Sequence, residues 1–461
     1  MDAGLATLSG LPRSLWMAAA LLAAVVVGMV AVVLPAQAAV MWVVTPIMLT
    51  LALLRPRVAL AAALGLAYVL PFAVAPVRVG LRPPIIELTL AVALAAALVR
   101  MAMGGWGRPW PARGWLGMVA GVLVFWALAV IVGGRMGQGV EEIQYVLKLM
   151  LAVAAGFLAV GIGADWRVAR RTAAVVAALG ALQSLLAAMV FRAGTGALPF
   201  YEELETAGYP EAGTALRYLP DQETLRAVGT LVDPNILGAS LAVSLVLAVG
   251  LSIIASDRSR WLWLAVAGIT LPGLALSLSR GAWMAAGLGI LIFVWRRNHG
   301  LVVTAMVALA AVVVLAPFES VAHFRSGLLV RDESAALRLD EFAEAGRVIA
   351  SAPVFGVGFP AQPPAAYFVG VSNTFLWVAE HIGLPGTVLS VVAAIGACVV
   401  GLRSRVASSL APVFAAAAVV ALVAGLVDHH FASVPHMVML QWSLLGLAVG
   451  AARRDQGAIR T

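Results

Sequence analysis

Charged residues are scarce in this chain, and their scarcity argues against a water-soluble protein. Asp, Glu, Lys and Arg make up only 11% of the 461 residues, while 62% are hydrophobic and the mean hydropathy is +1.01. Soluble domains carry roughly a quarter charged residues. The composition therefore predicts a protein whose solvent is largely the lipid bilayer.

Three further absences narrow the class of protein. The single cysteine, Cys398, excludes an intramolecular disulfide, and its apolar neighbours indicate an inert buried thiol. No segment alternates with the period of two that a membrane barrel needs, so the spans are expected to be helices. The sequence shows neither zinc-type ligand spacing nor a basic cluster interleaved with aromatic residues. We therefore expect no bound metal, no cofactor and no nucleic-acid partner.

Long apolar runs are abundant, and runs of about 20 residues predict membrane-spanning helices. They lie near 15–34, 38–54, 58–76, 85–103, 115–133, 144–164, 172–191, 231–254, 261–278, 281–296, 299–316, 386–402, 408–427 and 434–451. The second, tenth and twelfth are short. The pattern predicts an all-α polytopic membrane protein with about 12–14 transmembrane helices. Ala36-Gln37-Ala38 resembles a signal-peptide cleavage site, but the length of the first run favours an uncleaved helix.

The basic residues predict which side of the membrane each connection faces. With the N-terminus inside, 18 of the 30 Lys and Arg residues fall on the inner side, against only four acidic residues. Short basic loops stay in the cytoplasm. We therefore expect an inner (cytoplasmic) membrane protein with both termini in the cytoplasm.

Two predicted outward segments are too long to be turns, and such loops are usually functional or disordered. They divide the chain into N-terminal transmembrane helices (1–191), an outward acidic loop (192–230), central transmembrane helices (231–316), a long, partly helical outward (periplasmic) loop (317–385), and C-terminal transmembrane helices with a cytoplasmic tail (386–461). No internal repeat is evident.

The second outward loop contains a predicted amphipathic helix from Ser334, a helix-capping residue type, to Ala350. Its apolar side chains are expected to rest on the membrane, and its charged ones to face water. The apolar set is Leu337, Phe342, Val348 and Ile349, and the charged set is Arg338, Glu341, Glu344 and Arg347.

Two polar motifs stand at the predicted outer ends of the central spans. Arg280, in Leu276–Trp283, offers a planar donor fork that suits phosphate, although an interfacial arginine can also reach lipid head groups. Asp233-Pro234-Asn235 is typical of a helix start, with Asp as the cap and Pro in the first turn.

Two more polar motifs lie towards the C-terminus. In Ser372–Gly386, either Ser372 or Asn373 is a candidate cap, and Glu380 and His381 are either interfacial residues or, for His381, a general base. Asp428-His429-His430 lies in the last outward connection. Adjacent residues on a helix point to different faces, so joint metal binding by the two histidines is not expected.

These segments together resemble the O-antigen ligase and O-antigen polymerase superfamily of membrane glycosyltransferases. The matching segments occur in order: GTLVDPNILGA at 229–239, LSRGAW at 278–283, ALRLDEF and SAPVFGVGF within 336–359, SNTFLWVAEHIGLPG at 372–386 and LVDHHF at 426–431. The resemblance covers the C-terminal half of the chain, while the N-terminal spans match only as generic hydrophobic helices.

The resemblance implies a GT-C-like fold and a reaction. Members transfer a glycan from an undecaprenyl-diphosphate carrier to a hydroxyl of a glycan, lipid or protein acceptor at the outer membrane face, without metal. Arg280 matches the arginine of the family's Ser-Arg-Gly motif, and Arg338 matches its loop arginine. The residues expected to be catalytic are Arg280, Arg338, Ser372, Asn373 and His381, and those expected to bind substrate are Asp233, Asn235, Glu380, Asp428 and His429.

The chain departs from the ligase pattern at Ser372. That pattern has a histidine there, followed by Asn, Ser or Gln and by two glycine-type positions, whose spacing Asn373, Gly383 and Gly386 keep. An isolated serine is a poor base at neutral pH. The base could come from His381 or from Asp428, His429 and His430, the reaction could rely on leaving-group stabilisation, or ligase activity could be lost. Because both arginines persist, we favour a retained transferase of polymerase type.

Two other functions fit the composition. A flippase for lipid-linked oligosaccharides, or another polysaccharide transporter, would also place arginines near a diphosphate. Transporters often show repeated halves with broken helices at the membrane midplane, whereas this chain concentrates its polar residues at one face. A non-catalytic partner of a polysaccharide exporter is the third possibility.

Overall fold

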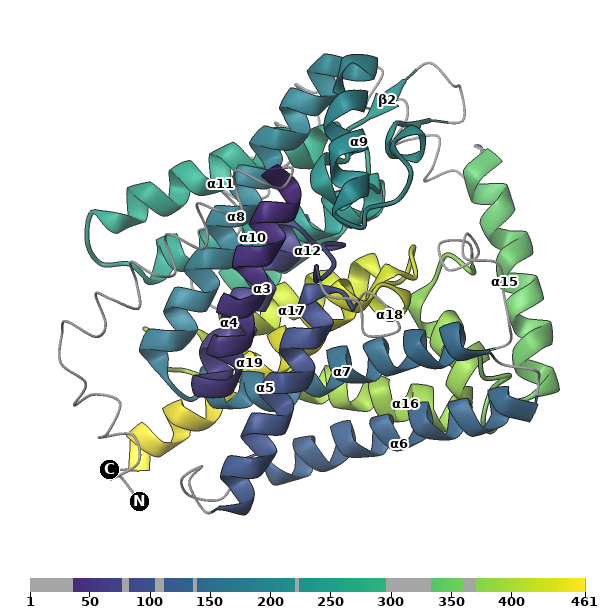
Figure 1. Ribbon diagram of the computed structural model, residues 1–461. Coiled ribbons are helices and arrows are strands. Elements are labelled where there is room, and N and C mark those ends of the chain that lie inside the picture. The colour runs from purple at the N-terminus through teal and green to yellow at the C-terminus, as the bar shows by residue number, and fades with distance from the viewer. Residues whose placement is uncertain are drawn as a thin grey trace.

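The computed structural model describes residues 36–76, 83–103, 112–135, 139–219, 224–295, 333–359 and 370–460, which are almost entirely helical (Figure 1). The predicted spans at 15–34 and 299–316 lie outside the described residues. The other twelve predicted spans each coincide with a helix. These are α3 (Ala36–Leu54), α4 (Pro56–Val69), α5 (Ile85–Ala102), α6 (Arg113–Arg135), α7 (Val140–Gly163), α8 (Trp166–Ala193), α10 (Pro234–Ile254), α11 (Ser259–Leu276), α12 (Arg280–Trp295), α16 (Thr374–Leu402), α17 (Ala411–Ala424) and α19 (Pro435–Arg460).

Length and composition show how these helices relate to a membrane. Within the described ranges, eight helices are long and apolar enough to span one, and four shorter apolar helices accompany them. The fold is therefore that of an all-α polytopic membrane protein. Cys398 is a buried free cysteine in α16, as its apolar surroundings predict.

The apolar windows of α10 and α19 are almost wholly buried, so these helices form the centre of the bundle. Helix α19 packs against α7 through glycines on both helices. A Cβ atom added to Gly446 would lie 2.5 Å from the carbonyl oxygen of Gly156, and one added to Gly450 would lie 2.1 Å from that of Val160. Small residues allow such close backbone approach between membrane helices. The N-terminal and C-terminal parts of the chain are thus joined by backbone packing.

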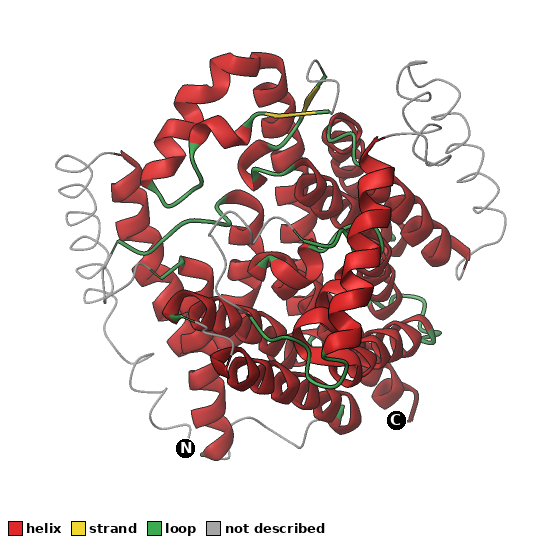
Figure 2. Cartoon of the chain, turned by 90° about the vertical axis from the view of Figure 1, so that its right-hand side faces the viewer, coloured by secondary structure: helices red, strands yellow, loops and turns green. Residues whose placement is uncertain are grey.

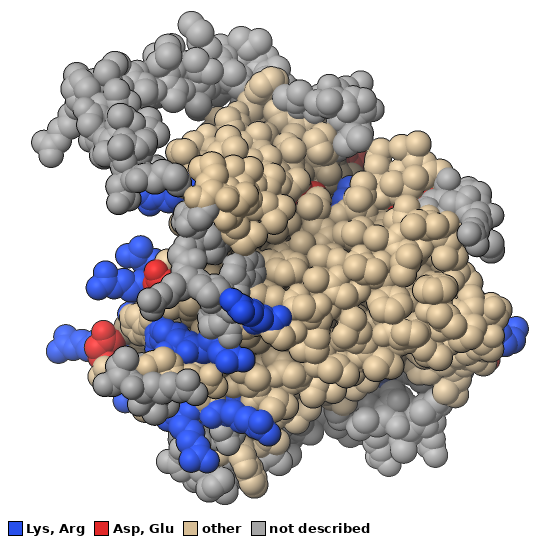
Figure 3. Space-filling model, turned by 90° about the horizontal axis from the view of Figure 1, so that it is seen from below, with Lys and Arg blue, Asp and Glu red and all other residues tan. Residues whose placement is uncertain are grey.

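One end of the bundle is rich in arginine, and we call it the basic end. Arg100 at the end of α5 donates to the carbonyl oxygens of Leu53 and Leu54 at 2.7 and 2.8 Å, and Ser404 donates to Asp455 at 2.6 Å. These bonds bring helix ends from distant parts of the sequence together. Figure 3 shows Lys and Arg side chains gathered at one edge of the visible face, beside a broad band without charged side chains. The arginines at these helix ends are Arg55, Arg57, Arg100, Arg167, Arg170, Arg171, Arg258, Arg260, Arg403, Arg405, Arg453 and Arg454.

The opposite end carries the polar connections, and we call it the loop end. Its elements are η1 (Gly194–Ala197), α9 (Leu198–Thr206), η2 (Ala212–Ala215), β1 (Arg217–Tyr218), β2 (Leu225–Arg226), η3 (Gly229–Leu231), α15 (Glu333–Ser351) and α18 (His430–Ser433). In the view with α15 in front, loop segments lie in the middle of the molecule and the two short strands near its top (Figure 2). The acidic segment has a small core of its own around Tyr201, Leu204 and Tyr209. It is therefore a folded layer over the membrane helices.

Helix α15 confirms the predicted helix at 334–350, but the prediction that Arg338 and Glu341 face water is wrong. Both side chains are partly buried. A carboxylate oxygen of Glu341 accepts a hydrogen bond from the backbone N–H of Ser372 at 2.9 Å. The Glu341 carboxylate lies inward because the Ser372 N–H, just before α16, needs a hydrogen-bond acceptor that a carboxylate can supply.

Candidate functional site

Three arginines from separate segments meet at the loop end. Arg226 in β2 is held by two hydrogen bonds, from Nε to the Ser277 carbonyl at 3.0 Å and from Nη2 to Oδ1 of Asn235 at 2.7 Å. Burial lowers the pKa of Arg226 to about 10; the charges of Arg280 and Arg338 lower it too, while those of Asp233 and Asp428 oppose them. The charges of four side chains, three of them from distant segments, therefore act on Arg226 here.

Arg226 is absent from the residues predicted to form the site. The available signal was its position three residues before the Gly229–Gly238 motif, in a polar segment next to a span. What the sequence could not show is that β2 brings it to Asn235 and to the end of α11. Arg217, its antiparallel partner on β1, is exposed instead.

The start of α10 explains how Asn235 reaches Arg226. The Asp233 carboxylate accepts hydrogen bonds from the N–H groups of Asn235 and Ile236 at 2.7 and 3.0 Å, which confirms the predicted cap. Val232 before it has a φ of 62°, an uncommon value for a β-branched residue. This turn and Pro234 at the first helical position fix the first turn of α10, so that the Asn235 amide points at the arginine.

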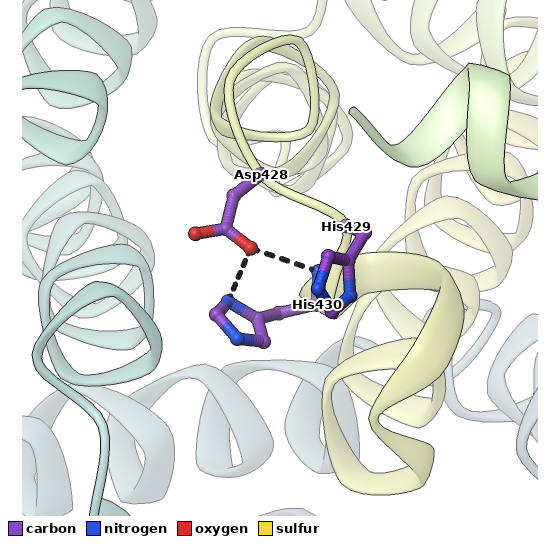
Figure 4. A group of neighbouring side chains, drawn as sticks. All are labelled: Asp428, His429 and His430. Carbon is purple, nitrogen blue, oxygen red and sulfur yellow. Dashed lines mark hydrogen bonds and ion pairs between the residues drawn. The ribbon is translucent and has the colours of Figure 1, made fainter. Parts of the chain in front are cut away.

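Asp428 and His430 form a buried ion pair between α17 and α19 (Figure 4). The Asp428 Oδ1 lies 2.5 Å from His430 Nδ1 and accepts the backbone N–H of His430 at 3.2 Å. Burial alone would raise the pKa of Asp428, but His430 outweighs it and holds the pKa at about 2. Burial alone would lower the pKa of His430, but Asp428 and Asp233 raise it to about 9. Both partners are therefore charged at neutral pH.

His429 differs from its neighbour in both partner and charge. Its Nδ1 lies 2.7 Å from the Ser433 hydroxyl, and burial together with the charge of His430 lowers its pKa to about 4. The expectation that the two histidines point apart is wrong, since their ring centroids lie 5.0 Å apart. His429 is the residue just before α18, and its ring is drawn towards Ser433 while that of His430 pairs with Asp428.

The donor atoms of Asp428, His429 and His430 lie within 4.8 Å of one another. Three such atoms are the usual minimum for a metal site. The Asp428–His430 ion pair, however, already satisfies two of the three groups. The expectation that the chain binds no metal remains a prediction.

The first turn of α16 is tied to this cluster. Asn373, one of the two candidate caps, accepts the N–H groups of Phe375 and Leu376 at 2.9 and 3.0 Å. Its Nδ2 donates to the Leu426 carbonyl at 2.9 Å, and the Thr374 hydroxyl donates to the Asp428 carbonyl at 2.9 Å. Asn373 thus has a structural role, and it fixes Ser372 next to Glu341.

Helix α16 begins at Thr374, earlier than the span predicted at 386–402, and the predicted break is the single non-helical residue Gly383. Pro385 has no N–H, so the carbonyl of His381 loses its helical partner. The segment 353–358 supplies the missing bonds: Val357 N–H donates to Glu380 O at 2.7 Å, Gly358 N–H donates to His381 O at 3.2 Å, and Leu384 N–H donates to Pro353 O at 2.8 Å. We call this contact the backbone clamp. This close backbone approach explains why the motifs SAPVFGVGF and SNTFLWVAEHIGLPG both carry glycine.

His381 lies in an aromatic cluster beside the clamp. Its ring stacks on Trp377 with centroids 4.1 Å apart, and Phe359 lies 4.6 Å away. Its Nδ1 contacts the carbonyl oxygen of Trp377 at 2.7 Å. These contacts give His381 a packing role, and the neighbouring Glu380 is close enough to Glu344 of α15 for their charges to interact.

Replacing Gly383 by alanine is expected to destabilise the protein by several kcal/mol. Its φ is 79°, and an added Cβ would lie 2.2 Å from the carbonyl oxygen of Val354. Backbone strain and overpacking each cost about 1–3 kcal/mol. Thermal unfolding in detergent measures the loss. Gly396→Ala, in the same helix with nothing within 4 Å of an added Cβ, is the matched control, and equal midpoints for the two variants would contradict the clamp.

Comparison with known proteins points to a segment that contains part of this site. The family model described as O-antigen ligase matches residues 265–391, which include Arg280, Arg338, Ser372 and Asn373. No curated protein matches the chain. The chain is therefore similar to the O-antigen ligase family over this segment, and the match supports the resemblance that the sequence motifs suggest.

Proposed function

We propose that this O-antigen ligase-like glycosyltransferase takes its glycan from an undecaprenyl-diphosphate carrier and transfers it to an acceptor hydroxyl. The observation that carries the proposal is the convergence of Arg226, Arg280 and Arg338 on one charged cluster at the loop end. A glycosyl diphosphate leaves as a polyanion, and arginines are the side chains best suited to bind it.

The charge balance of the cluster supports this assignment. Arg226 is influenced by two other arginines and by only two aspartates. One of these aspartates, Asp428, is already neutralised by His430. Among the charges that act on Arg226, the positive ones therefore outweigh the negative ones, and a bound diphosphate would compensate them.

The chemistry then needs little beyond positioning and charge stabilisation. The acceptor oxygen bonds to the anomeric carbon while the bond between that carbon and the diphosphate oxygen breaks. Negative charge develops on the leaving diphosphate, and fixed guanidinium groups stabilise it without having to reorganise. Because arginine can do this work, we propose that transfer requires no metal.

The arrangement of charge supports an orientation. We propose that the basic end faces the cytoplasm, since short arginine-rich connections are retained there. The loop end then faces outward from the inner membrane, both termini are cytoplasmic, and the five-segment division of the chain follows from this orientation. A growing glycan is the acceptor that we favour, as in a polymerase of cell-surface polysaccharide.

Transfer by the purified protein in liposomes tests the proposal against the flippase alternative. The substrates are an undecaprenyl-diphosphate-linked glycan and a glycan acceptor, with and without a metal chelator. We expect a longer glycan in both conditions, and none from the Arg280→Ala, Arg338→Ala double variant. Movement of the carrier across the liposome membrane without any transfer would refute the enzyme and favour a transporter.

A further inference from the structure

His429 carries a ring nitrogen that is poised to accept a proton. The Ser433 hydroxyl lies 2.7 Å from His429 Nδ1 and 3.2 Å from the carbonyl oxygen of His429. The same carbonyl oxygen accepts the N–H groups of Ala432 and Ser433 at 2.8 and 3.0 Å, and the hydroxyl has a single hydrogen to donate. In the tautomer in which Nδ1 donates to the hydroxyl and the hydroxyl donates to the carbonyl, the lone pair lies on Nε2.

The Cδ2 edge of the His429 ring lies near the segment before α16. A Cβ added to Gly370 would lie 3.9 Å from His429 Cδ2, the carbon bonded to Nε2. Glu341 links the same two segments, because it accepts the Ser372 N–H and its charge acts on His429. His429 and Ser372 therefore flank one region of the loop end.

The neighbouring histidines are less suitable proton acceptors. His430 is tied through Nδ1 to Asp428 in an ion pair, and a protonated imidazole has no lone pair to offer. The ring of His381 is partly buried in α16, where it stacks on Trp377 beside Phe359 and donates from Nδ1 to the Trp377 carbonyl. Among these three, His429 is the neutral ring that lies against the segment just before Ser372.

We propose that Nε2 of His429 is the general base that deprotonates the acceptor hydroxyl, in place of the histidine that the family pattern has at position 372. This inference rests on the proposed function. Nε2 takes the hydroxyl proton as the acceptor oxygen bonds to the anomeric carbon. The electron pair of the broken carbon–oxygen bond leaves with the diphosphate, and the proton then passes from His429 to water.

The charges around His429 decide when it can act. His430 disfavours the protonated ring, while Asp428 from the same turn, Asp233 from α10 and Glu341 from α15 favour it; His381 of α16 is also coupled to it. In the unliganded protein the ring is neutral and thus competent. A diphosphate bound by the nearby arginines adds negative charge, which raises the pKa of His429 and makes it a stronger base.

Replacement of His429 by asparagine tests this role. The asparagine amide can keep the bond to Ser433 but has no group at the Nε2 position. We expect His429→Asn to lower transfer about a hundredfold while binding of the lipid-linked donor, measured separately, stays unchanged. The wild-type rate falls as pH drops and Nε2 becomes protonated, and this acid limb should vanish in the variant.

Two further variants make the test decisive. Adding Ser372→His to His429→Asn should restore part of the rate and the acid limb, because a base then stands on the other side of the same region. His436→Asn, which replaces another buried histidine of the loop end, should transfer within about threefold of wild type. The proposal that His429 is the base would be overturned by wild-type transfer in His429→Asn or by loss of donor binding in that variant. An equal loss of transfer in His436→Asn would overturn it too. Absence of transfer by the wild-type protein would instead refute the proposed function.

Discussion

Arg226→Ala is expected to lower the rate of glycan transfer by about 10²- to 10³-fold, the cost of removing one fixed donor from a charge-stabilising site. Its guanidinium is held in direction by Ser277 and Asn235. A lysine cannot make both bonds from one rigid fork, so Arg226→Lys should recover only part of the rate. Initial rates of transfer in liposomes measure both variants.

Arg217→Ala is the matched control, because Arg217 pairs with Arg226 across the two strands but is exposed. It should transfer at close to the wild-type rate. If Arg226→Ala and Arg217→Ala were equally active, Arg226 would have no part in stabilising the leaving group. Thermal unfolding of both variants separates a chemical defect from a folding defect.

Asp428→Asn should destabilise the protein by about 3–5 kcal/mol near pH 6, because it leaves the His430 charge buried without its partner. The pKa of Asp428 lies at about 2, below the value near 3.9 of an unfolded aspartate, and that of His430 lies at about 9, above the unfolded value near 6.5. The contribution of the pair is therefore complete between about pH 4 and 6.5. It is lost as the pH falls through about 2 or rises through about 9.

Thermal unfolding in detergent across this pH range checks the prediction. The wild-type midpoint should fall between pH 6.5 and 9, and the gap between wild type and Asp428→Asn should narrow over the same interval. Asp340→Asn, at an exposed position on α15, should change the free energy of unfolding by no more than about 0.5 kcal/mol. A gap that widened towards pH 9 would show that the ion pair does not stabilise the fold.

The spans and helix caps could be predicted because they depend on local sequence. A run of apolar residues needs a helix wherever it lies in lipid, and α10 and α16 begin where Asp233 and Asn373 can cap them. The helical form of 334–350 follows from the same local logic. Its inward-facing charges do not, because an amphipathic pattern defines two faces without saying which one meets the protein.

The site was only partly predictable, since its geometry depends on contacts between distant segments. Arg280 and Arg338 could be singled out by their motifs, whereas Arg226 depends on a two-residue strand that brings it to Asn235. His381 packs in an aromatic cluster with Trp377 and Phe359, and the Phe359 contact comes from a different segment, which its own motif does not predict. His430 is charged because it pairs with Asp428, whereas burial and the charge of His430 keep His429 neutral, and adjacency in sequence does not reveal this difference.

The glycine contact between α7 and α19 has a mechanical consequence. Alternating access in transporters usually requires one group of helices to rock against another. Here a helix of the N-terminal part and the central C-terminal helix approach so closely that added Cβ atoms would overlap the opposite backbone. Any sliding or tilting at this seam would force carbonyl groups into one another. A bundle whose central helices are in direct backbone contact is rigid at its centre, and this rigidity is suited to holding a reaction centre still while lipid and glycan chains move past it.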